Sequence, residues 1–241
     1  MGISKQQGIA APTISEVLEK FLREQEKRIS RKTFSKYRNV IELLQHSLNG
    51  YAYDCLDDEE TELFERLRKS RGNADLNFCE VFGPEHILDN VDEFLSYFMV
   101  RKVMASKELL RASGTVTKKL ARWLQQKGYV EAEDAEEACL LGAEAARELP
   151  AAEELVELLN KLADYSESGE PTEIVEGQFV ITRVEGHRIW LEELLGDGEF
   201  GPIVLPPMVA ARCRGGWRIS GVVCRFRRRW SIMEAWNIYP M

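Results

Sequence analysis

The hydrophobic residues of this chain change their spacing near Gly169, and that change decides the class of fold. Before it, apolar residues recur every three or four positions, which is typical of amphipathic helices. From Glu176 onward they alternate with polar residues, which is typical of β-strands. We therefore predict an α+β protein in which the two kinds of structure are segregated, with a helical bundle first and a small sheet last.

Three ranges follow from this change of spacing. We predict an α-helical bundle domain over residues 1–130, an acidic helical connector and linker over 131–173, and a small five-stranded β-barrel over 174–241. The segment 166–171, SESGEP, has the composition of a linker. The pattern of the last range fits an SH3-like barrel and an OB-like barrel equally, and a closed barrel leaves no exposed edge strand.

Capping residues and breakers predict where the helices begin and end. Thr13 and Glu16 form a capping-box pattern that starts a helix over 14–27. A second helix starts near Ser30 or Lys32 and stops at Asn49-Gly50, and Asp57 and Asp58 can cap a third. The remaining expectations are an end of the third helix at Arg71-Gly72-Asn73, a long helix over 87–104, a break at Ser113-Gly114 between two short helices, and a break at Pro150.

The last range predicts five short strands. A hairpin turning at Glu185-Gly186 comes first, and an Arg-rich tip at residues 227–229 joins the last two strands. Because small barrels need several large side chains inside, we expect most of the aromatic residues of this range to lie in its core. They are Phe179, Trp190, Trp217, Phe226, Trp230, Trp236 and Tyr239.

Residues 101–130 form a basic island in an acidic chain. They hold eight Lys and Arg against the single carboxylate of Glu108, whereas the whole chain has a formal net charge of −8. Such an island predicts a local surface for a polyanion. The predicted nucleic-acid-binding residues are Lys107, Arg111, Thr115, Thr117, Lys118, Lys119 and Arg122, with Arg227, Arg228 and Arg229 at the hairpin tip. We expect Thr115 and Thr117 at the start of the helix that follows Ser113-Gly114, facing away from its apolar stripe.

Two long acidic blocks limit this prediction. Residues 51–100 and 131–176 are both strongly acidic, and carboxylates weaken contacts with phosphates. Any contact with nucleic acid is therefore confined to patches. The alternative interpretation is that amphipathic helices here merely carry solvated charged faces that segregate by sign.

Residues 13–130 resemble the helical, SAM-like core-binding domain of tyrosine recombinases and phage integrases. The similar positions are Ile14, Val17, Leu18, Phe21 and Leu22, then Ser30, Thr33, Tyr37 and Ile41, then Phe94-Leu95, and finally Leu120, Trp123, Leu124 and Gly128-Tyr129-Val130. The resemblance implies a domain that grips DNA. The catalytic domain of that family is missing, since none of His46, His86 and His187 is followed by Arg three positions later. A winged-helix arrangement over 107–130, with 113–126 as the recognition helix, is the alternative among DNA-binding folds.

No motif predicts an enzyme, a cofactor or a metal. The chain lacks phosphate-binding glycine loops and nucleophile elbows, its three His are scattered, and its five Cys form no paired spacing. We therefore expect a non-catalytic protein that binds nucleic acid, duplex DNA first, without a cofactor. It has no membrane-spanning run and no secretory pattern, so we expect a cytoplasmic location.

A second hypothesis of function is a protein-interaction adaptor. In it the acidic connector and the barrel recruit partners, and the helical domain is a scaffold. The apolar stripe of the helix over residues 153–165 would pack on the same chain, on a partner protein or on a second copy.

Overall fold

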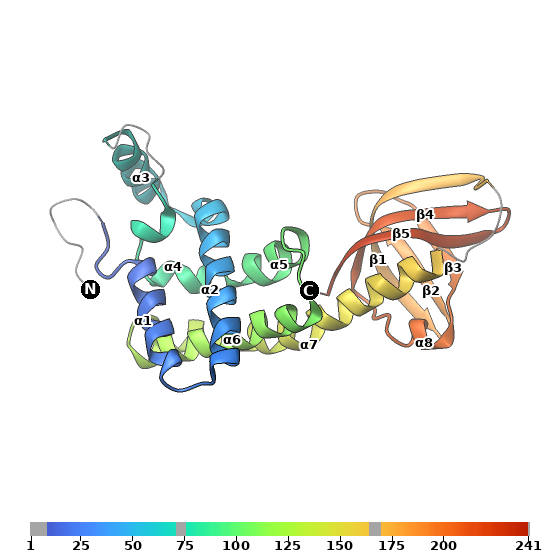
Figure 1. Cartoon of the computed structure of the whole chain (residues 1–241). Helices are drawn as coiled ribbons and strands as arrows, with labels where there is room; N and C mark the ends of the chain where they lie inside the picture. Colours follow the sequence, from blue (N-terminus) through green and yellow to red (C-terminus); the bar gives the residue numbers. More distant parts are fainter. Residues whose placement is uncertain (1–8, 71–75, 164–169, 241) are drawn as a thin grey trace. The chain divides into compact units, whose positions relative to one another are not determined.

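The structure, a computed structural model, describes residues 9–70, 76–163 and 170–240 (Figure 1). It is an α+β protein in which helices precede a five-stranded sheet closed into a ring. Two compact units divide the chain. We call residues 1–99 with 109–146 the first unit, and residues 100–108 with 147–241 the second unit.

The first unit is built on two helices whose predicted starts are confirmed. Helix α1 (Ile14–Glu26) begins with the capping box, in which Thr13 and Glu16 exchange side-chain and backbone hydrogen bonds. Helix α2 (Arg31–Tyr51) is capped by the Ser30 hydroxyl, which accepts from the N–H of Thr33. The two helices pack through Phe21, whose ring lies 6.1 Å from that of Tyr37.

Shorter segments complete this core. They are η1 (Ala52–Cys55), α3 (Asp58–Ser70), η2 (Phe78–Glu80), α4 (Glu85–Asp89), the π-helix η3 (Glu93–Phe98) and α5 (Met99–Arg101). Asp57 caps α3 as predicted, by accepting from the N–H of Glu60 at 2.8 Å. The predicted end of α3 at residues 71–73 lies outside the described residues.

The predicted single helix over 87–104 is wrong. Its start is the short helix α4, which stops at Asn90, where the side-chain amide turns back and donates to the carbonyl of His86 at 2.8 Å. Beyond Asn90 the chain winds as a π-helix, which brings Phe94, Leu95 and Phe98 into the core. The hydrophobic spacing is the same in both arrangements, so it does not distinguish them.

Two predicted helix breaks are also wrong. Helix α6 (Lys107–Gln126) runs through Ser113-Gly114, and helix α7 (Ala132–Ala163) runs through Pro150. Gly114 and Gly142 lie where α6 and α7 cross in the first unit, because a Cβ added to Gly114 would come 2.4 Å from the Gly142 carbonyl oxygen. At Pro150, buried Leu149 and Ala152 hold the helix on both sides, which offsets the roughly 3 kcal/mol that an internal proline costs.

The second unit contains the ring. Its strands are β1 (Glu173–Glu185), β2 (Arg188–Glu193), β3 (Glu199–Val204), β4 (Arg218–Phe226) and β5 (Arg229–Tyr239), with the short helix α8 (Pro207–Ala210) between β3 and β4. They pair in the order β1-β2-β3-β5-β4 and close on themselves. The predicted hairpin between β1 and β2 is confirmed, and Gly186 makes its turn with φ +59°.

The ring closes through a thin seam, and α7 covers it. Strands β3 and β5 pair only at Ile203 and Trp230. Along the rest of β5, the Asn160 side chain of α7 binds the backbone of Ala235, donating to its carbonyl and accepting from its N–H at 2.8 Å each. Leu155 and Leu159 of the same helix are buried in the core of the ring.

Helix α7 is therefore not a separate connector. Its residues to Ala146 belong to the first unit and those from Arg147 belong to the second. The predicted range 131–173 differs from this division. The many acidic residues of α7 suggest a solvated connector, although α7 also carries two apolar faces, one packed in each unit. The predicted linker at 166–171 lies mostly outside the described residues, which include only Glu170 and Pro171 of it.

Among the residues that the structure describes, no helix has both the length and the apolar character needed to cross a membrane.

Candidate nucleic-acid interface

The basic island folds into α6, which presents part of it to solvent. Arg111, Lys119 and Arg122 are exposed and recur about every turn or two along one side of the helix, while Lys118 is half-buried. We call these four residues the α6 basic face. All four belong to the first unit.

The prediction that Thr115 and Thr117 lie at the start of a helix is wrong. Because α6 is continuous, both are inside it, and their backbone N–H groups are used within the helix. Thr115 donates its hydroxyl to the carbonyl of Arg111 at 2.9 Å. Thr117 is only 1% exposed, so the prediction that it faces away from the apolar stripe is wrong. Its spacing from Leu120 and Leu124 places it on that stripe.

Lys107 has a partner of its own in the second unit. Its ammonium group donates to Oε2 of Glu157 at 2.8 Å. That hydrogen bond raises the pKa of Lys107 and lowers the pKa of Glu157. A phosphate at Lys107 would have to compete with this carboxylate. We therefore do not include Lys107 in the α6 basic face.

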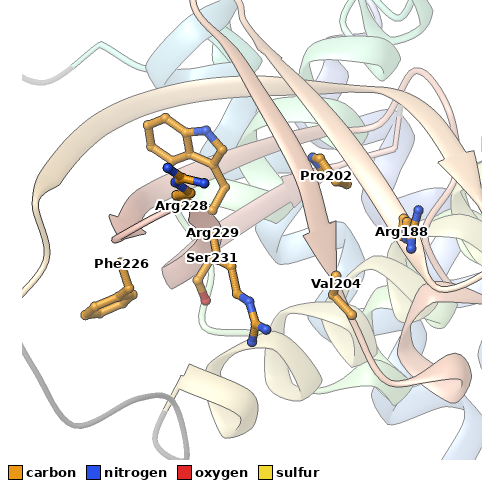
Figure 2. Close-up of a pocket in the computed structure, with 8 residues that line it drawn as sticks. Arg188, Pro202, Val204, Phe226, Arg228, Arg229 and Ser231 are labelled. Carbon is orange, nitrogen blue, oxygen red and sulfur yellow. The ribbon is translucent and has the colours of Figure 1, made fainter.

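The Arg-rich hairpin tip lies beside a groove in the second unit (Figure 2). Arg227 makes the turn between β4 and β5 with φ 55°, and the groove of about 490 Å³ opens next to it. Figure 2 shows Phe226, Arg228, Arg229 and Ser231 along one side, with Arg188, Pro202 and Val204 on the other. These residues and Trp230 line what we call the arginine groove.

The groove combines positive charge with aromatic surface. Arg188, Arg228 and Arg229 are all exposed, and the residues lining the groove include no carboxylate. Trp230 is half-buried and held from behind by Phe200, whose ring lies 4.9 Å away at a near-perpendicular angle. Guanidinium groups bind phosphates with two parallel N–H donors, and an indole face stacks on planar rings.

Of the residues that line this groove, the sequence predicts only Arg228 and Arg229 as binding residues. Arg228 and Arg229 were singled out because they are adjacent in the chain, but Arg188, Phe226 and Trp230 were not assigned to a site. Arg188 follows the first hairpin turn, some forty positions earlier, and only the closure of the ring through β3 and β5 brings it near the tip. The expectation that most of the aromatic residues of this range lie in the core is wrong. Phe179, Trp217 and Tyr239 are buried, whereas Trp190, Phe226 and Trp230 are half-buried and Trp236 is 40% exposed.

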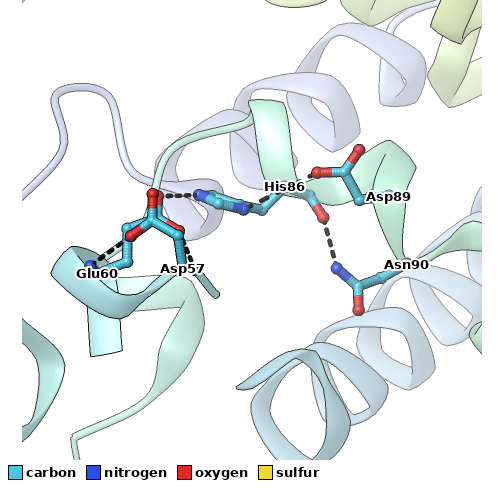
Figure 3. Close-up of polar contacts among 5 residues, drawn as sticks. All are labelled: Asp57, Glu60, His86, Asp89 and Asn90. Atoms are coloured by element: carbon cyan, nitrogen blue, oxygen red, sulfur yellow. Dashed lines mark hydrogen bonds and ion pairs between the residues drawn. The ribbon is translucent and has the colours of Figure 1, made fainter. Parts of the chain in front are cut away.

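A second polar cluster, in the first unit, has a structural role (Figure 3). The ring of His86 packs edge-on against Phe78 and Phe82, and its Nε2 is 3.0 Å from Oε1 of Glu60 in α3. Its Nδ1 lies 3.9 Å from a carboxylate oxygen of Asp89. Within the described residues, no three His, Cys, Asp or Glu side chains gather as a metal site would require. The cluster instead joins α3 to α4.

No protein family, no curated protein and no solved structure matches this chain. The arginine groove and the α6 basic face are therefore the features of this chain from which a function can be inferred.

Proposed function

We propose that this protein binds nucleic acid and that the arginine groove receives a single-stranded segment. The observation that carries the proposal is the gathering of three exposed guanidinium groups around Trp230 in one groove without a carboxylate. Phosphates pair with arginine, and bases stack on indole. A duplex hides its base faces, so the aromatic side of the groove favours a single strand.

The topology of the ring supports the same proposal. The strand order β1-β2-β3-β5-β4, with a helix between β3 and β4, favours an OB-like barrel over an SH3-like one. OB-fold proteins bind oligonucleotides beside the β1–β2 and β4–β5 loops and across β2 and β3. The arginine groove lies between the same elements here, although a fold alone does not fix a function.

Duplex DNA at the α6 basic face is a second candidate. Arg111, Lys119 and Arg122 are exposed along one side of a continuous helix, which suits contact with a row of phosphates. The resemblance of residues 13–130 to core-binding domains favours this candidate. Thr117 and Lys107 are no longer part of it, because the first is buried and the second is paired with Glu157.

The adaptor hypothesis loses part of its support. Leu155 and Leu159, the centre of the stripe that would pair with a partner or a second copy, are buried in the chain's own ring. Self-association through residues 153–165 would have to expose them. We therefore place nucleic-acid binding ahead of the adaptor.

The test is fluorescence anisotropy with a labelled oligo(dT) strand and a labelled duplex of mixed sequence. Two variants remove the same charge from the two surfaces: Arg188→Ser with Arg228→Ser in the groove, and Arg111→Ser with Arg122→Ser on α6. We expect the groove variant to bind the single strand roughly tenfold more weakly, a loss of about 1.4 kcal/mol. The α6 variant should leave single-strand binding unchanged, and it should weaken duplex binding if α6 contacts DNA.

A salt series completes the test. If the three arginines neutralise three phosphates, the logarithm of the single-strand affinity should fall with the logarithm of salt concentration at a slope of roughly −2. Absence of saturable binding to either probe would refute the proposal. An unaltered single-strand curve in the groove variant would remove the groove from the interface.

A further inference from the structure

A second cavity in the ring has the opposite chemistry. It has a volume of about 480 Å³, close to that of the arginine groove, and is lined by residues of β1, β2, β4 and β5 together with Arg101 and Leu195. Two carboxylates line it, Glu176 and Glu193, against the single guanidinium of Arg101. All of these residues belong to the second unit. We call it the Trp236 cavity.

Trp236 faces this cavity because of an irregularity in β5. Ser220 pairs with Asn237, and the next residue, Gly221, pairs with Ala235, so Trp236 is the extra residue of a β-bulge. A bulge re-aims one side chain without ending the strand. A large apolar side chain that is 40% exposed at such a position is not explained by the core of the ring.

Gly177 of β1 lines this cavity and carries no side chain that could fill it. Its partner across the β1–β4 ladder is Gly221. A Cβ at Gly221 would lie 2.1 Å from the carbonyl oxygen of Glu234, so β4 and β5 approach too closely for any other residue. A Cβ at Gly177 would lie 3.7 Å from Oε1 of Glu193, so that carboxylate lies next to Gly177.

We propose that the Trp236 cavity binds an arginine side chain of a partner protein. An indole face attracts a guanidinium, and carboxylates accept its paired N–H donors. The excess of carboxylates disfavours the phosphates of a nucleic acid, which the arginine groove favours. At the rim, Leu195 is 97% exposed and Leu194 is 39% exposed, so apolar residues flanking the arginine also find a surface. This inference does not depend on nucleic-acid binding.

The probe is the blocked peptide Ac-Leu-Arg-Leu-NH2, and its matched control carries citrulline, which has the shape of arginine without its charge. The full-length chain is labelled with 5-fluorotryptophan, and its five Trp residues are followed by fluorine NMR. The Trp236→Phe variant assigns the resonance of Trp236. We expect the arginine peptide to shift that resonance saturably and the citrulline peptide to bind about tenfold more weakly, because charge-assisted hydrogen bonds are lost.

Charge removal at the cavity tests the same contact from the other side. The Glu176→Gln and Glu193→Gln double variant should bind the arginine peptide about tenfold more weakly, with the other four resonances and the thermal midpoint unchanged. Equal binding of the arginine and citrulline peptides would overturn the proposal, and so would a Trp236 resonance that does not move. A stronger shift with maltotriose would assign the cavity to a neutral sugar instead.

Discussion

Asn160 takes the place of a neighbouring strand at the seam of the ring. Its amide has one donor side and one acceptor side, which match the carbonyl and the N–H of Ala235. Ala235 is 2% exposed, so water cannot replace these bonds. One side chain therefore satisfies the backbone of β5 at Ala235, beyond the single pair of residues that joins β5 to β3.

Replacement of Asn160 by Ala should destabilise the second unit. Two buried backbone groups would lose their partners, and we expect the free energy of unfolding to fall by about 2–3 kcal/mol. Urea unfolding followed through tryptophan fluorescence measures it, because four of the five Trp residues, buried Trp217 among them, belong to the second unit. Lys161→Ala, at the exposed neighbouring position, is the control. Equal stability of the two variants would mean that the seam is held by apolar packing alone.

Cys79 provides a pH-dependent contribution to the first unit. Burial raises the pKa of its thiol from 9.0 to about 12. The folded state therefore holds its proton more tightly than the unfolded state. The stabilisation is complete below pH 9 and is lost as the pH rises toward 12.

Between pH 9 and 11, the wild type should lose about 2 kcal/mol more stability than Cys79→Ala. The quantity to compare is the change in stability from pH 9 to pH 11 in each protein, because the substitution also changes packing by the same amount at both pH values. Urea unfolding of both proteins at both pH values, in the presence of reductant, measures this change. Cys55→Ala should depart from the wild type by less than Cys79→Ala does, because burial raises the pKa of this exposed thiol too, but of the two only Cys79 is fully buried. Parallel pH profiles of wild type and Cys79→Ala would show that the thiol does not contribute.

At the scale of elements, one glycine sets how closely α6 and α7 cross. In Gly114→Ala, the new methyl group would lie 2.4 Å from the Ala146 nitrogen and from the Gly142 oxygen. Both are helix backbone and cannot move aside cheaply. We expect a loss of about 1–3 kcal/mol in the stability of the first unit, although alanine is the better helix former.

Gly50→Ala in α2 is the matched control. A Cβ at Gly50 meets nothing within 4 Å. The same substitution there should stabilise the first unit by about 0.5–1 kcal/mol, through helix propensity and a less flexible unfolded chain. Thermal unfolding of both variants decides the matter. A gain in both would mean that α6 and α7 separate readily at their crossing.

Glycine and proline also mark the limit of prediction from the sequence. The starts of α1, α2 and α3 could be predicted because Thr13, Ser30 and Asp57 bind backbone groups only three residues away. Local propensity predicts a helix break at Gly114, because it takes no account of the glycine's partner, Gly142, which lies 28 positions further along. Local propensity predicted a break where a contact distant in sequence requires a small residue within a helix.

The candidate site follows the same rule. Arg228 and Arg229 could be identified because neighbouring charges are visible in a sequence. Arg188 and Trp230 could not, since their proximity depends on the order of strands in the ring. The Trp236 cavity could not be predicted either. A β-bulge changes the face of the sheet on which the following residues lie, so strict alternation along the sequence assigns that face wrongly.

At the scale of the whole molecule, charge is separated by surface and not by domain. The ring carries the arginine groove and the Trp236 cavity in one unit, one lined by three guanidinium groups and the other by two carboxylates with one guanidinium. The net charge of −8 repels nucleic acid at long range. Affinity for it must therefore come from basic residues close to the bound strand, because physiological salt screens charges that lie more than about 8 Å apart.

The second unit should need the C-terminal half of α7 in order to fold. Residues 174–241 contain all five strands of the ring, apart from Glu173, the first residue of β1. They lack Leu155, Leu159 and Asn160 of α7. Each buried leucine is worth about 1.5–3 kcal/mol, and the asparagine contributes further. Together these losses are comparable to the roughly 5–15 kcal/mol that stabilises a typical domain.

We therefore expect a fragment of residues 147–241 to unfold cooperatively on heating. A fragment of residues 174–241, cut at the boundary that hydrophobic spacing alone predicts, should show no cooperative transition or one at a clearly lower temperature. Near-ultraviolet circular dichroism reports the fixed environment of Trp217, which both fragments contain and which is buried. Carrying Leu155→Ala and Leu159→Ala, the longer fragment should behave like the shorter one, because it then lacks the same core. Equal thermal midpoints for the two fragments would show that the ring is complete without α7.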